Sequence, residues 1–392
     1  MNIKLIKVFL KLIINEIKVK RNFSIFKRKY FFYLNKKKIS KKNYISNIKN
    51  YFFDSLNKIK YKIITPVYEI NFTEAERNFF KEKIIGVKDS SKLKVIKEGF
   101  ICIFKNVKFY GMSGGISYKN KVLIESVFDK SRFLHNIICP DSRILRYKYV
   151  EGLSTSIMHL NLAKNNLYHW IIDCLPRLYA ITKYPETKIN FIVNKDIDEL
   201  QLEMLKIFLD DRFKIIPIDR NEVWYLEKYL FSSFISNPCS GYLPVEYLNF
   251  IKNKFIRNYG IKVNKKNKRI YISRQKALKR KLKNEKQLFD LLKKYNFERV
   301  YSEDYSFKEQ VEIFSSASII ISIHGAGLTN MIFSENLKVI EIYPANFITT
   351  HYFMLAKALG FKYKYIIGDE LDNKLNFRID LSKVESLIKD LI

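Results

Sequence analysis

From about residue 63 onward, short apolar or β-branched runs alternate with stretches whose apolar residues recur at helical spacing. In the first part of the chain, the pattern predicts helices at residues 169–182 and 199–209 and from Pro244 to about 258, and strands at 100–104, 107–110, 121–125, 189–193, 214–217 and 226–233. In the second part, it predicts strands at 269–273, 298–301, 318–323 and 338–343, and helices at 285–295, 306–315, 329–333 and 351–359. Strands that alternate with helices at this pitch are typical of parallel βαβ units, so the sequence predicts an α/β fold.

The first 62 residues have a different pattern. They contain 18 Lys or Arg and only two acidic residues, Glu16 and Asp54. Their net charge of 18 − 2 = +16 is half of the net charge of +32 of the whole chain. Between residues 3 and 18 the lysines recur at helical spacing among apolar residues, as in a basic amphipathic helix at a membrane surface. A basic helical extension packed on the protein itself explains the pattern equally well. We treat residues 1–62 as a separate extension.

No run reaches the roughly 20 apolar residues that cross a bilayer, and no signal-peptide pattern is evident at the amino end. We therefore expect a cytoplasmic protein, with peripheral contact to the inner face of a membrane as an option. The cysteines (Cys102, Cys139, Cys174 and Cys239) show no metal-ligand spacing, and ordinary thiols are the expectation.

The clearest candidate for chemistry follows the apolar strand 318–323. That run ends directly at His324, Gly325, Ala326 and Gly327, just before the short helix predicted at 329–333. Ligands of doubly wound sheets bind outside the carboxyl ends of strands, and glycines and free N–H groups there suit an anion. A tight turn with an ordinary histidine is the competing interpretation.

A second candidate is the arginine-rich segment that follows strand 269–273. Arg274 comes directly after the strand, and Arg280, Asn284 and Glu285 follow. Guanidinium groups bind phosphate through two parallel hydrogen bonds and offset the charge of a diphosphate. Surface charge remains an alternative, because four lysines occupy the same stretch.

These segments resemble glycosyltransferase family 61. The matching pieces are Arg-x-Tyr-Ile-Ser-Arg at 269–274, Arg-x-Leu-x-Asn-Glu at 280–285, Ser-Phe-x-Glu-Gln at 306–310, His-Gly-Ala-Gly-Leu-Thr-Asn at 324–330 and Val-Ile-Glu-Ile-Tyr-Pro at 339–344. In the first half, Asn-Leu-Tyr-His-Trp-x-x-Asp-x-x-Pro-Arg at 166–177 matches the family's other block. The resemblance runs from about residue 100 to 365.

The resemblance implies a GT-B arrangement: two Rossmann-like domains facing a cleft, with an acceptor-side domain at 63–245 and a nucleotide-sugar-binding domain at 246–392. It implies inverting transfer of a sugar from a nucleotide-diphosphate sugar to a glycan or lipid-linked acceptor, without an obligatory metal or other cofactor. The substrate-binding residues would be Asn166, Arg177, Arg274, Arg280, Asn284, Glu285, His324, Gly325, Ala326, Gly327, Asn330 and Glu341.

Inverting transfer needs a base that deprotonates the acceptor hydroxyl. His169 and Asp173 are spaced i, i+4, which places them on one face of a helix. Either could be the base while the other orients it. A buried His–Asp pair that merely holds the helix is the alternative.

One motif points elsewhere. Asp196 and Asp198 follow the strand at 189–193, as in the Asp-x-Asp motif of metal-dependent GT-A enzymes. We favour a helix cap at Asp196, with Asp198 in the first turn of the next helix.

A non-catalytic class also fits the composition. The net charge of +32, with Tyr 26 and Phe 31, would suit a protein that binds nucleic acid or another anionic polymer. No helix-turn-helix or zinc motif supports that alternative, and we expect no nucleic-acid partner.

Overall fold

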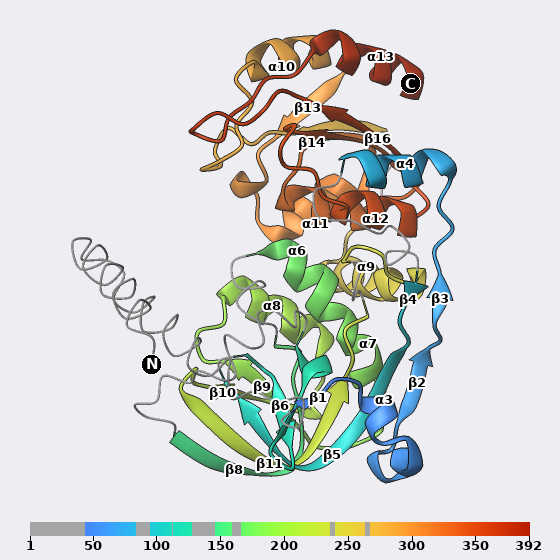
Figure 1. Ribbon diagram of the computed structural model, residues 1–392. Helices are drawn as coiled ribbons and strands as arrows, with labels where there is room; N and C mark the ends of the chain where they lie inside the picture. Colours follow the sequence, from blue (N-terminus) through green and yellow to red (C-terminus); the bar gives the residue numbers. More distant parts are fainter. Residues whose placement is uncertain are drawn as a thin grey trace, which may run out of the picture.

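The computed structural model describes residues 44–83, 95–111, 113–127, 146–158, 166–235, 240–262 and 267–392. It is a mixed α/β structure with two main sheets, a nine-stranded sheet in the N-terminal half and a five-stranded sheet in the C-terminal half. Figure 1 shows the halves stacked one above the other, with helices between the two sheets. The basic amphipathic helix predicted between residues 3 and 18 and the thiols of Cys139 and Cys239 fall outside the described residues.

The five-stranded sheet is entirely parallel, with the order β13-β12-β14-β15-β16. Its strands are β12 (Lys268–Ile272), β13 (Phe297–Val300), β14 (Ala317–Ile323), β15 (Lys338–Tyr343) and β16 (Lys362–Ile367). The helices α10 (Glu285–Lys293) and α13 (Leu381–Leu391) cover one face, and the face toward the other half is covered by α11 (Phe307–Ser315), η8 (Ala326–Phe333) and α12 (His351–Ala358). This doubly wound arrangement agrees with the sequence pattern.

The nine-stranded sheet is mixed, with the order β1-β7-β6-β5-β11-β8-β9-β10 and β2 paired to β5. Strands β11, β8, β9 and β10 are mutually parallel, whereas β5 is antiparallel to β11 and β6. The bounds are β1 (Tyr44–Ile45), β2 (Lys62–Thr65), β5 (Gly99–Tyr110), β6 (Ile116–Tyr118), β7 (Lys121–Leu123), β8 (Arg146–Thr155), β9 (Ile189–Asn194), β10 (Phe213–Ile218) and β11 (Glu222–Ser232). Only part of this sheet has the parallel pattern of the Rossmann-like domain that we expected.

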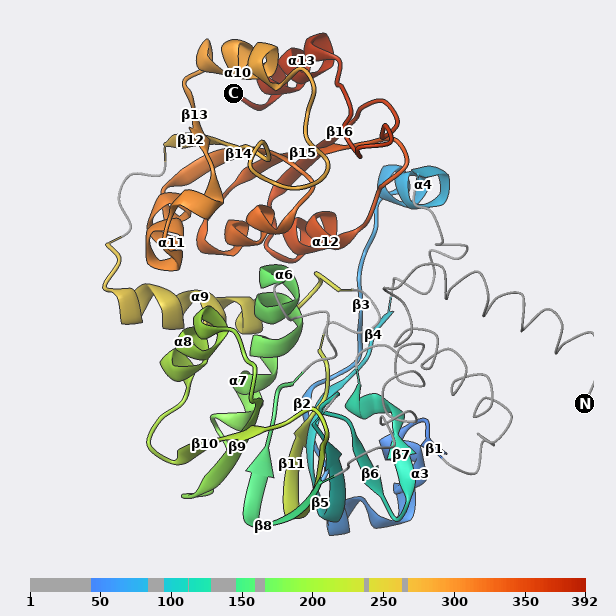
Figure 2. The same ribbon diagram turned by 90° about the vertical axis from the view of Figure 1, so that its left-hand side faces the viewer.

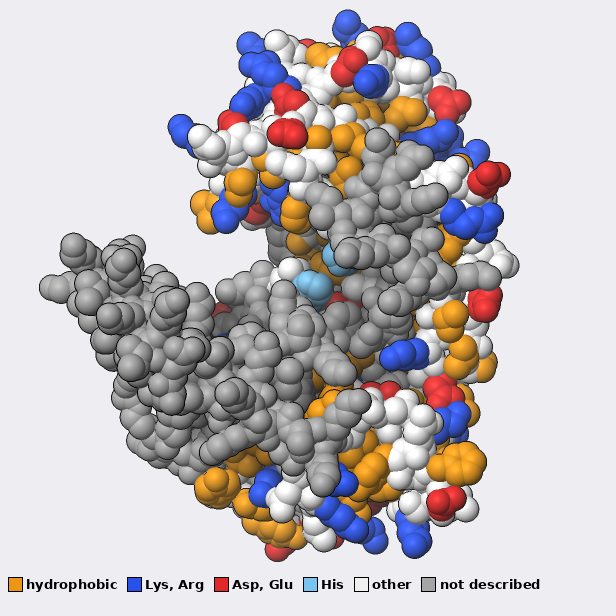
Figure 3. All heavy atoms as spheres, in the orientation of Figure 1, with side chains coloured by type: hydrophobic (Ala, Val, Ile, Leu, Met, Phe, Trp, Pro, Cys, Tyr) orange, Lys and Arg blue, Asp and Glu red, His pale blue; other side chains and the backbone are white. Residues whose placement is uncertain are grey.

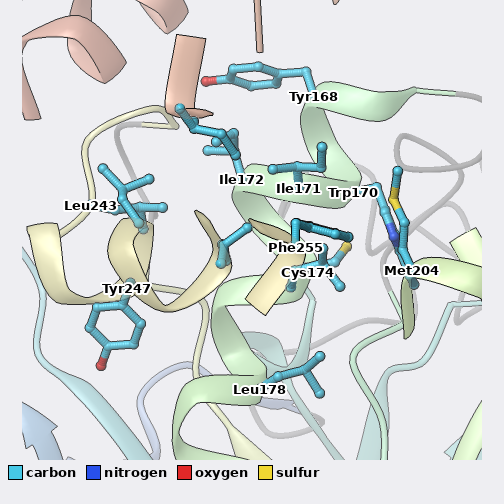
Figure 4. Close-up of a cluster of buried hydrophobic side chains, with 14 of the residues drawn as sticks. Tyr168, Trp170, Ile171, Ile172, Cys174, Leu178, Met204, Leu243, Tyr247 and Phe255 are labelled. Carbon is cyan, nitrogen blue, oxygen red and sulfur yellow. The ribbon is translucent and has the colours of Figure 1, made fainter. Parts of the chain in front are cut away.

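The predicted helix at 169–182 is a run of shorter helical segments. They are α6 (Leu167–His169), the π segment η5 (Trp170–Cys174), the 3₁₀ turn η6 (Leu175–Arg177) and α7 (Leu178–Ile181). We call this run the 167–181 helix. Together with α8 (Glu199–Phe208) and α9 (Val245–Tyr259), it builds the buried cluster shown in Figure 4.

Helix α9 joins the two halves through one aromatic side chain. The ring centroid of Phe255 lies 5.3 Å from that of Phe208 on α8 and 5.1 Å from that of Phe307 on α11. The apolar core is therefore continuous from the nine-stranded sheet to the inner face of the five-stranded sheet. A boundary at residue 245 does not divide this core, because α9 contributes to both sides.

A segment early in the chain also crosses between the halves (Figure 2). After β2 it forms β3 (Tyr68–Glu69), which pairs with β4 (Val95–Ile96), and continues into α4 (Glu74–Lys83) against the C-terminal half. Phe72 packs on Phe353 with ring centroids 6.5 Å apart, and Lys357 pairs with Glu76 at 2.9 Å.

Residues 44–62 belong to the nine-stranded sheet and its core, although the sequence pattern assigned them to the extension. β1 pairs with β7, and buried side chains from β1, α3 (Ile48–Tyr51) and η2 (Phe53–Ile59) pack beneath the sheet. Any separate extension is thus restricted to residues 1–43. In the described part of the chain, no helix has both the length and the apolar character of a membrane span.

The Asp-x-Asp motif caps a helix, but two residues later than predicted. The Asp198 carboxylate accepts hydrogen bonds from the backbone N–H groups of Leu200 and Gln201, at 3.0 and 3.3 Å, and so forms the N-cap of α8. Asp196 pairs instead with Arg220 at 3.0 Å. The expectation of a cap at Asp196 was therefore wrong.

Candidate functional site

The first part of the candidate site is an Asp–His pair on the 167–181 helix. Nδ1 of His169 lies 2.6 Å from Oδ2 of Asp173, and the hydroxyl of Ser240 donates to Oδ1 of the same carboxylate at 2.9 Å. The Asp173 side chain has no exposed surface, whereas that of His169 is 15% exposed. The contact expected from the i, i+4 spacing is therefore present, and the Asp173 carboxylate lies on the buried side of the His169 ring.

The backbone between these residues leaves regular α-helical geometry. The N–H of Leu175 bonds to the carbonyl of Trp170, five residues earlier, which closes a π turn. Such single π turns frequently occur at functional sites because they reposition side chains within a helix. His169 directly precedes this irregular turn and Asp173 lies within it. The preceding segment, α6, contacts η8 of the C-terminal half.

Two residues that the sequence interpretation missed connect this pair to the C-terminal half. Gly241 has a φ of +108°, and a Cβ added there would lie 2.3 Å from the carbonyl oxygen of His351. The His351 ring centroid lies 6.2 Å from that of His169 and 6.4 Å from that of His324. His351 thus links histidines from the two halves, and Figure 3 shows histidine side chains in the hollow between the halves.

Burial keeps the imidazole of His351 neutral. The pKa of His351 is lowered to about 4, chiefly because burial disfavours the charged ring. Repulsion from His324 and His169 lowers the pKa further, while the Asp173 carboxylate opposes the shift. The Nδ1 atom is 3.0 Å from the hydroxyl of Thr349.

The third histidine lies at the carboxyl edge of the five-stranded sheet, directly after β14. Nδ1 of His324 is 2.5 Å from Oε1 of Glu341, and the hydroxyl of Tyr363 donates to Oε2 of that carboxylate at 2.6 Å. Glu341 is fully buried, so these two neighbours engage both of its oxygens. The carboxylate orients the His324 ring.

Arg274 lies against the loop that follows His324. A Cβ added to Gly325 would lie 1.9 Å from Nη1 of Arg274, so the guanidinium occupies the space that any side chain at 325 would need. Nη2 of Arg274 donates to the carbonyl of Lys279 at 3.3 Å, and Nε is buried without a hydrogen-bond partner. Because β12 and β14 are adjacent parallel strands, the two candidate segments that follow them are brought together.

Arg280 is the second cation of this part of the site. Its backbone has a φ of +61°, its guanidinium lies 4.8 Å from the Phe347 ring centroid, and its Nη1 atom is buried without a partner. The pKa of Arg280 is lowered to about 10, first by burial and then by repulsion from Arg274. Burial also lowers the pKa of Arg274.

Neither arginine forms an ion pair with any carboxylate among the residues that the structure describes. The carboxylates of Glu303 and Glu341 act on these half-buried cations only through space, and two neighbouring cations that are partly removed from water are costly unless an anion joins them. The pair therefore has the character of an anion-binding site.

Other predicted site residues have structural contacts. The two oxygens of Glu285 are shielded from solvent, with the Ser273 hydroxyl donating to one of them. The Asn284 side chain exchanges hydrogen bonds with the backbone of Ile379, and that of Asn330 donates to Gln310 at 2.9 Å.

In the N-terminal half, Asn166 caps the 167–181 helix by accepting from the N–H of Tyr168 at 3.1 Å. Arg177 is buried and donates from Nε to the carbonyl of Ser232 at 2.9 Å. These contacts hold the site's framework, and a direct role in substrate binding stays a prediction for these residues. Within the described ranges, no group of three His, Cys, Asp or Glu residues is arranged to hold a metal ion.

Residues 167–340 match the sequence model of the family described as Glycosyltransferase 61. The matched region begins on the helix that carries His169 and ends on β15, so it includes both the Asp–His pair and the arginine site. The match supports membership of this glycosyltransferase family. No curated protein matches the chain in a sequence comparison.

Proposed function

We propose that this glycosyltransferase moves a sugar from a nucleotide-diphosphate sugar to a hydroxyl group of a glycan or lipid-linked acceptor. The observation that carries the proposal is the pair of half-buried arginines, Arg274 and Arg280, each of which has one buried nitrogen without a hydrogen bond and forms no ion pair with a carboxylate among the described residues. They lie where ligands of parallel α/β sheets bind, outside the carboxyl end of a strand.

The arginine site would hold the diphosphate. Guanidinium groups can bind phosphate oxygens through paired hydrogen bonds and can stabilise the charge that develops on a leaving diphosphate. Arg280 stays cationic at neutral pH with its pKa near 10, and the Gly325 loop lets Arg274 approach the backbone closely. This assignment requires no metal ion.

The Asp–His pair would supply the base for inverting transfer. With the Nδ1–H of His169 donating to the buried Asp173 carboxylate, the lone pair of the imidazole would be on Nε2. We assign proton abstraction from the acceptor hydroxyl to His169, and orientation of the ring to Asp173. The partial exposure of His169 and the complete burial of Asp173 support this order of roles.

The two halves would then divide the work as in a GT-B enzyme. The five-stranded sheet would carry the donor and the nine-stranded sheet the acceptor, with the reacting groups meeting near His351. Support for this division comes from His351, whose ring is near both His169 and His324.

The direct test is stabilisation of the intact protein by UDP, GDP and CDP in a thermal unfolding assay. We expect one nucleotide diphosphate to raise the unfolding temperature, and Arg274→Ala to abolish the shift. Arg299→Ala is the matched control, because Arg299 is an exposed arginine on β13 of the same sheet. No response to any nucleotide, or an equal loss in both variants, would refute the proposal. A screen of nucleotide sugars for donor hydrolysis then identifies the sugar.

A lipid-linked acceptor would require work at a membrane surface, and residues 1–43 contain much of the basic excess. The deletion should remove residues 1–43 and stop there, because residues 44–62 are part of the folded sheet. We expect the shortened chain to lose binding to anionic vesicles while it keeps nucleotide binding. Unchanged vesicle binding would exclude this role.

A further inference from the structure

The amino ends of β8 and β11 extend beyond the helices that cover the rest of their sheet. Figures 1 and 2 show these ends at the bottom of the molecule, opposite the junction between the halves. Three tyrosines are exposed there: Tyr147 is 60% exposed, Tyr149 57% and Tyr225 39%. Large exposed aromatic side chains grouped on adjacent strands often mark an interaction surface.

Strand register places these tyrosines on one face. Tyr225 is paired directly with Tyr149 on β8 and with Lys108 on β5. The ring centroids of Tyr147 and Tyr225 are 5.8 Å apart, and the ammonium group of Lys108 is 5.5 Å from the Tyr225 centroid. The three side chains therefore form one aromatic surface.

Lysines continue this face toward the helices. Lys228 on β11 pairs in register with Lys105 on β5, and the following pair, Leu230 and Ile103, is already buried beneath the helices. Because side chains two apart on a strand share a face, Lys228 and Lys105 are on the same side as that buried pair. Both are exposed.

We name Tyr147, Tyr149, Tyr225, Lys105, Lys108 and Lys228 the strand-end platform. One nearby carboxylate is that of Glu227, which pairs with Lys228 at 3.2 Å and accepts from the N–H of Gly152 at 2.7 Å. The platform therefore combines aromatic rings with an excess of positive charge. Along the lower edge of Figure 3, hydrophobic and basic side chains lie together.

We propose that the strand-end platform binds an extended anionic polysaccharide. Tyrosine rings stack on flat ligand faces, and lysines attract carboxylate or phosphate groups along a polymer. The platform is built from strand positions rather than from a protruding loop, which suits an extended chain better than insertion into a lipid layer. Membership of a glycosyltransferase family makes a glycan the fitting polymer.

Such a site would lie far from the place where the sugar is transferred. It lies at the end of the sheet opposite the 167–181 helix, so it would retain a growing or acceptor glycan while its end reacts elsewhere. Tethering one part of a ligand raises the effective concentration of the rest near a second site. The platform binds the polymer whether or not the proposed roles of Arg274 and His169 are correct.

The test is binding of oligogalacturonate to the full chain at physiological salt, compared with neutral dextran, oligouridylate and vesicles containing an anionic lipid. We expect Tyr147→Leu/Tyr149→Leu/Tyr225→Leu to weaken oligogalacturonate binding about tenfold or more, as loss of stacking does elsewhere. Tyr365→Ala is the control, since Tyr365 is a strand tyrosine with 37% exposure in the other sheet.

A second variant, Lys105→Gln/Lys108→Gln/Lys228→Gln, keeps the rings and should reduce both the affinity and its dependence on salt. Unfolding curves that match the wild type exclude misfolding as the cause. Oligogalacturonate affinity within twofold of wild type in both variants would overturn the proposal. A larger loss for oligouridylate or for vesicles than for oligogalacturonate would also overturn it, because the platform would then belong to another partner.

Discussion

The carbonyl oxygen of His351 lies so close to Gly241 that a Cβ at position 241 would come within 2.3 Å of it. This approach connects the first residue of α12 with the loop whose Ser240 hydroxyl donates to Asp173. A substitution at residue 241 is therefore expected to disturb the position of the Asp–His pair, although neither His169 nor Asp173 is changed.

Gly241→Ala tests this connection. The new methyl group would contact His351, and a φ of +108° is unfavourable for any residue with a Cβ. We expect a loss of at least about 1–2 kcal/mol in the free energy of unfolding, measured by chemical denaturation. Gly152→Ala is the control for the backbone effect, because Gly152 has a φ of +78° and no atom within 4 Å of the added Cβ. An equal loss in both variants would show that the contact with His351 is unimportant.

Asp173→Asn tests the proposed base. The amide keeps the size of the side chain but cannot stabilise an imidazolium at His169, so we expect kcat to fall by about 10²–10⁴ while KM changes little. His169→Ala should cause a similar fall, and neither change should alter nucleotide binding. Asp290→Asn, on the exposed face of α10, is the control. Near-normal transfer by both site variants would remove the pair from the mechanism.

Gly325→Ala tests the arrangement of the anion site. The added methyl group would overlap Nη1 of Arg274, which is the end of a flexible side chain, so the arginine is expected to move while the fold is retained. We expect nucleotide binding to weaken about tenfold, with a free energy of unfolding within about 1 kcal/mol of the wild type. In an Arg274→Ala background the same change should have little further effect, because the displaced group is already absent. Additive losses in this double-mutant cycle would contradict the direct contact.

The sequence predicted the C-terminal half more completely than the N-terminal half, for a physical reason. Buried parallel strands such as 318–323 are continuous apolar runs, which are easy to recognise in a sequence. The residues that follow such strands lie at the same carboxyl edge of the sheet, so the position of the candidate site follows from the strands. β16, with only Ile366 buried, and β8, with exposed tyrosines at one end, lack such a run and were not predicted.

The same reason explains the missed site residues. His351 was predicted only as the start of a helix, although its position after β15 already placed it near the carboxyl edge of the sheet. The contact of Gly241 with His351 depends on how the two halves pack, and spacing within one segment contains no information about that packing. The separation of Asp173 from solvent was likewise visible only in three dimensions.

The last prediction concerns pH. His351 has a folded-state pKa of about 4, below the ordinary value of 6.5, so the unfolded chain binds more protons at this residue between these two values. The contribution of this residue to stability is therefore complete above about pH 6.5 and is lost progressively as the pH falls toward 4, by about 2–3 kcal/mol. His351→Gln removes the titrating group, so the difference in unfolding free energy between variant and wild type should change across this window and stay constant above pH 7. Denaturant titrations at intervals from pH 4 to pH 8 measure this difference. A constant difference would mean that His351 remains protonated to the same extent in both states, and would contradict its assignment as a neutral imidazole between the two halves.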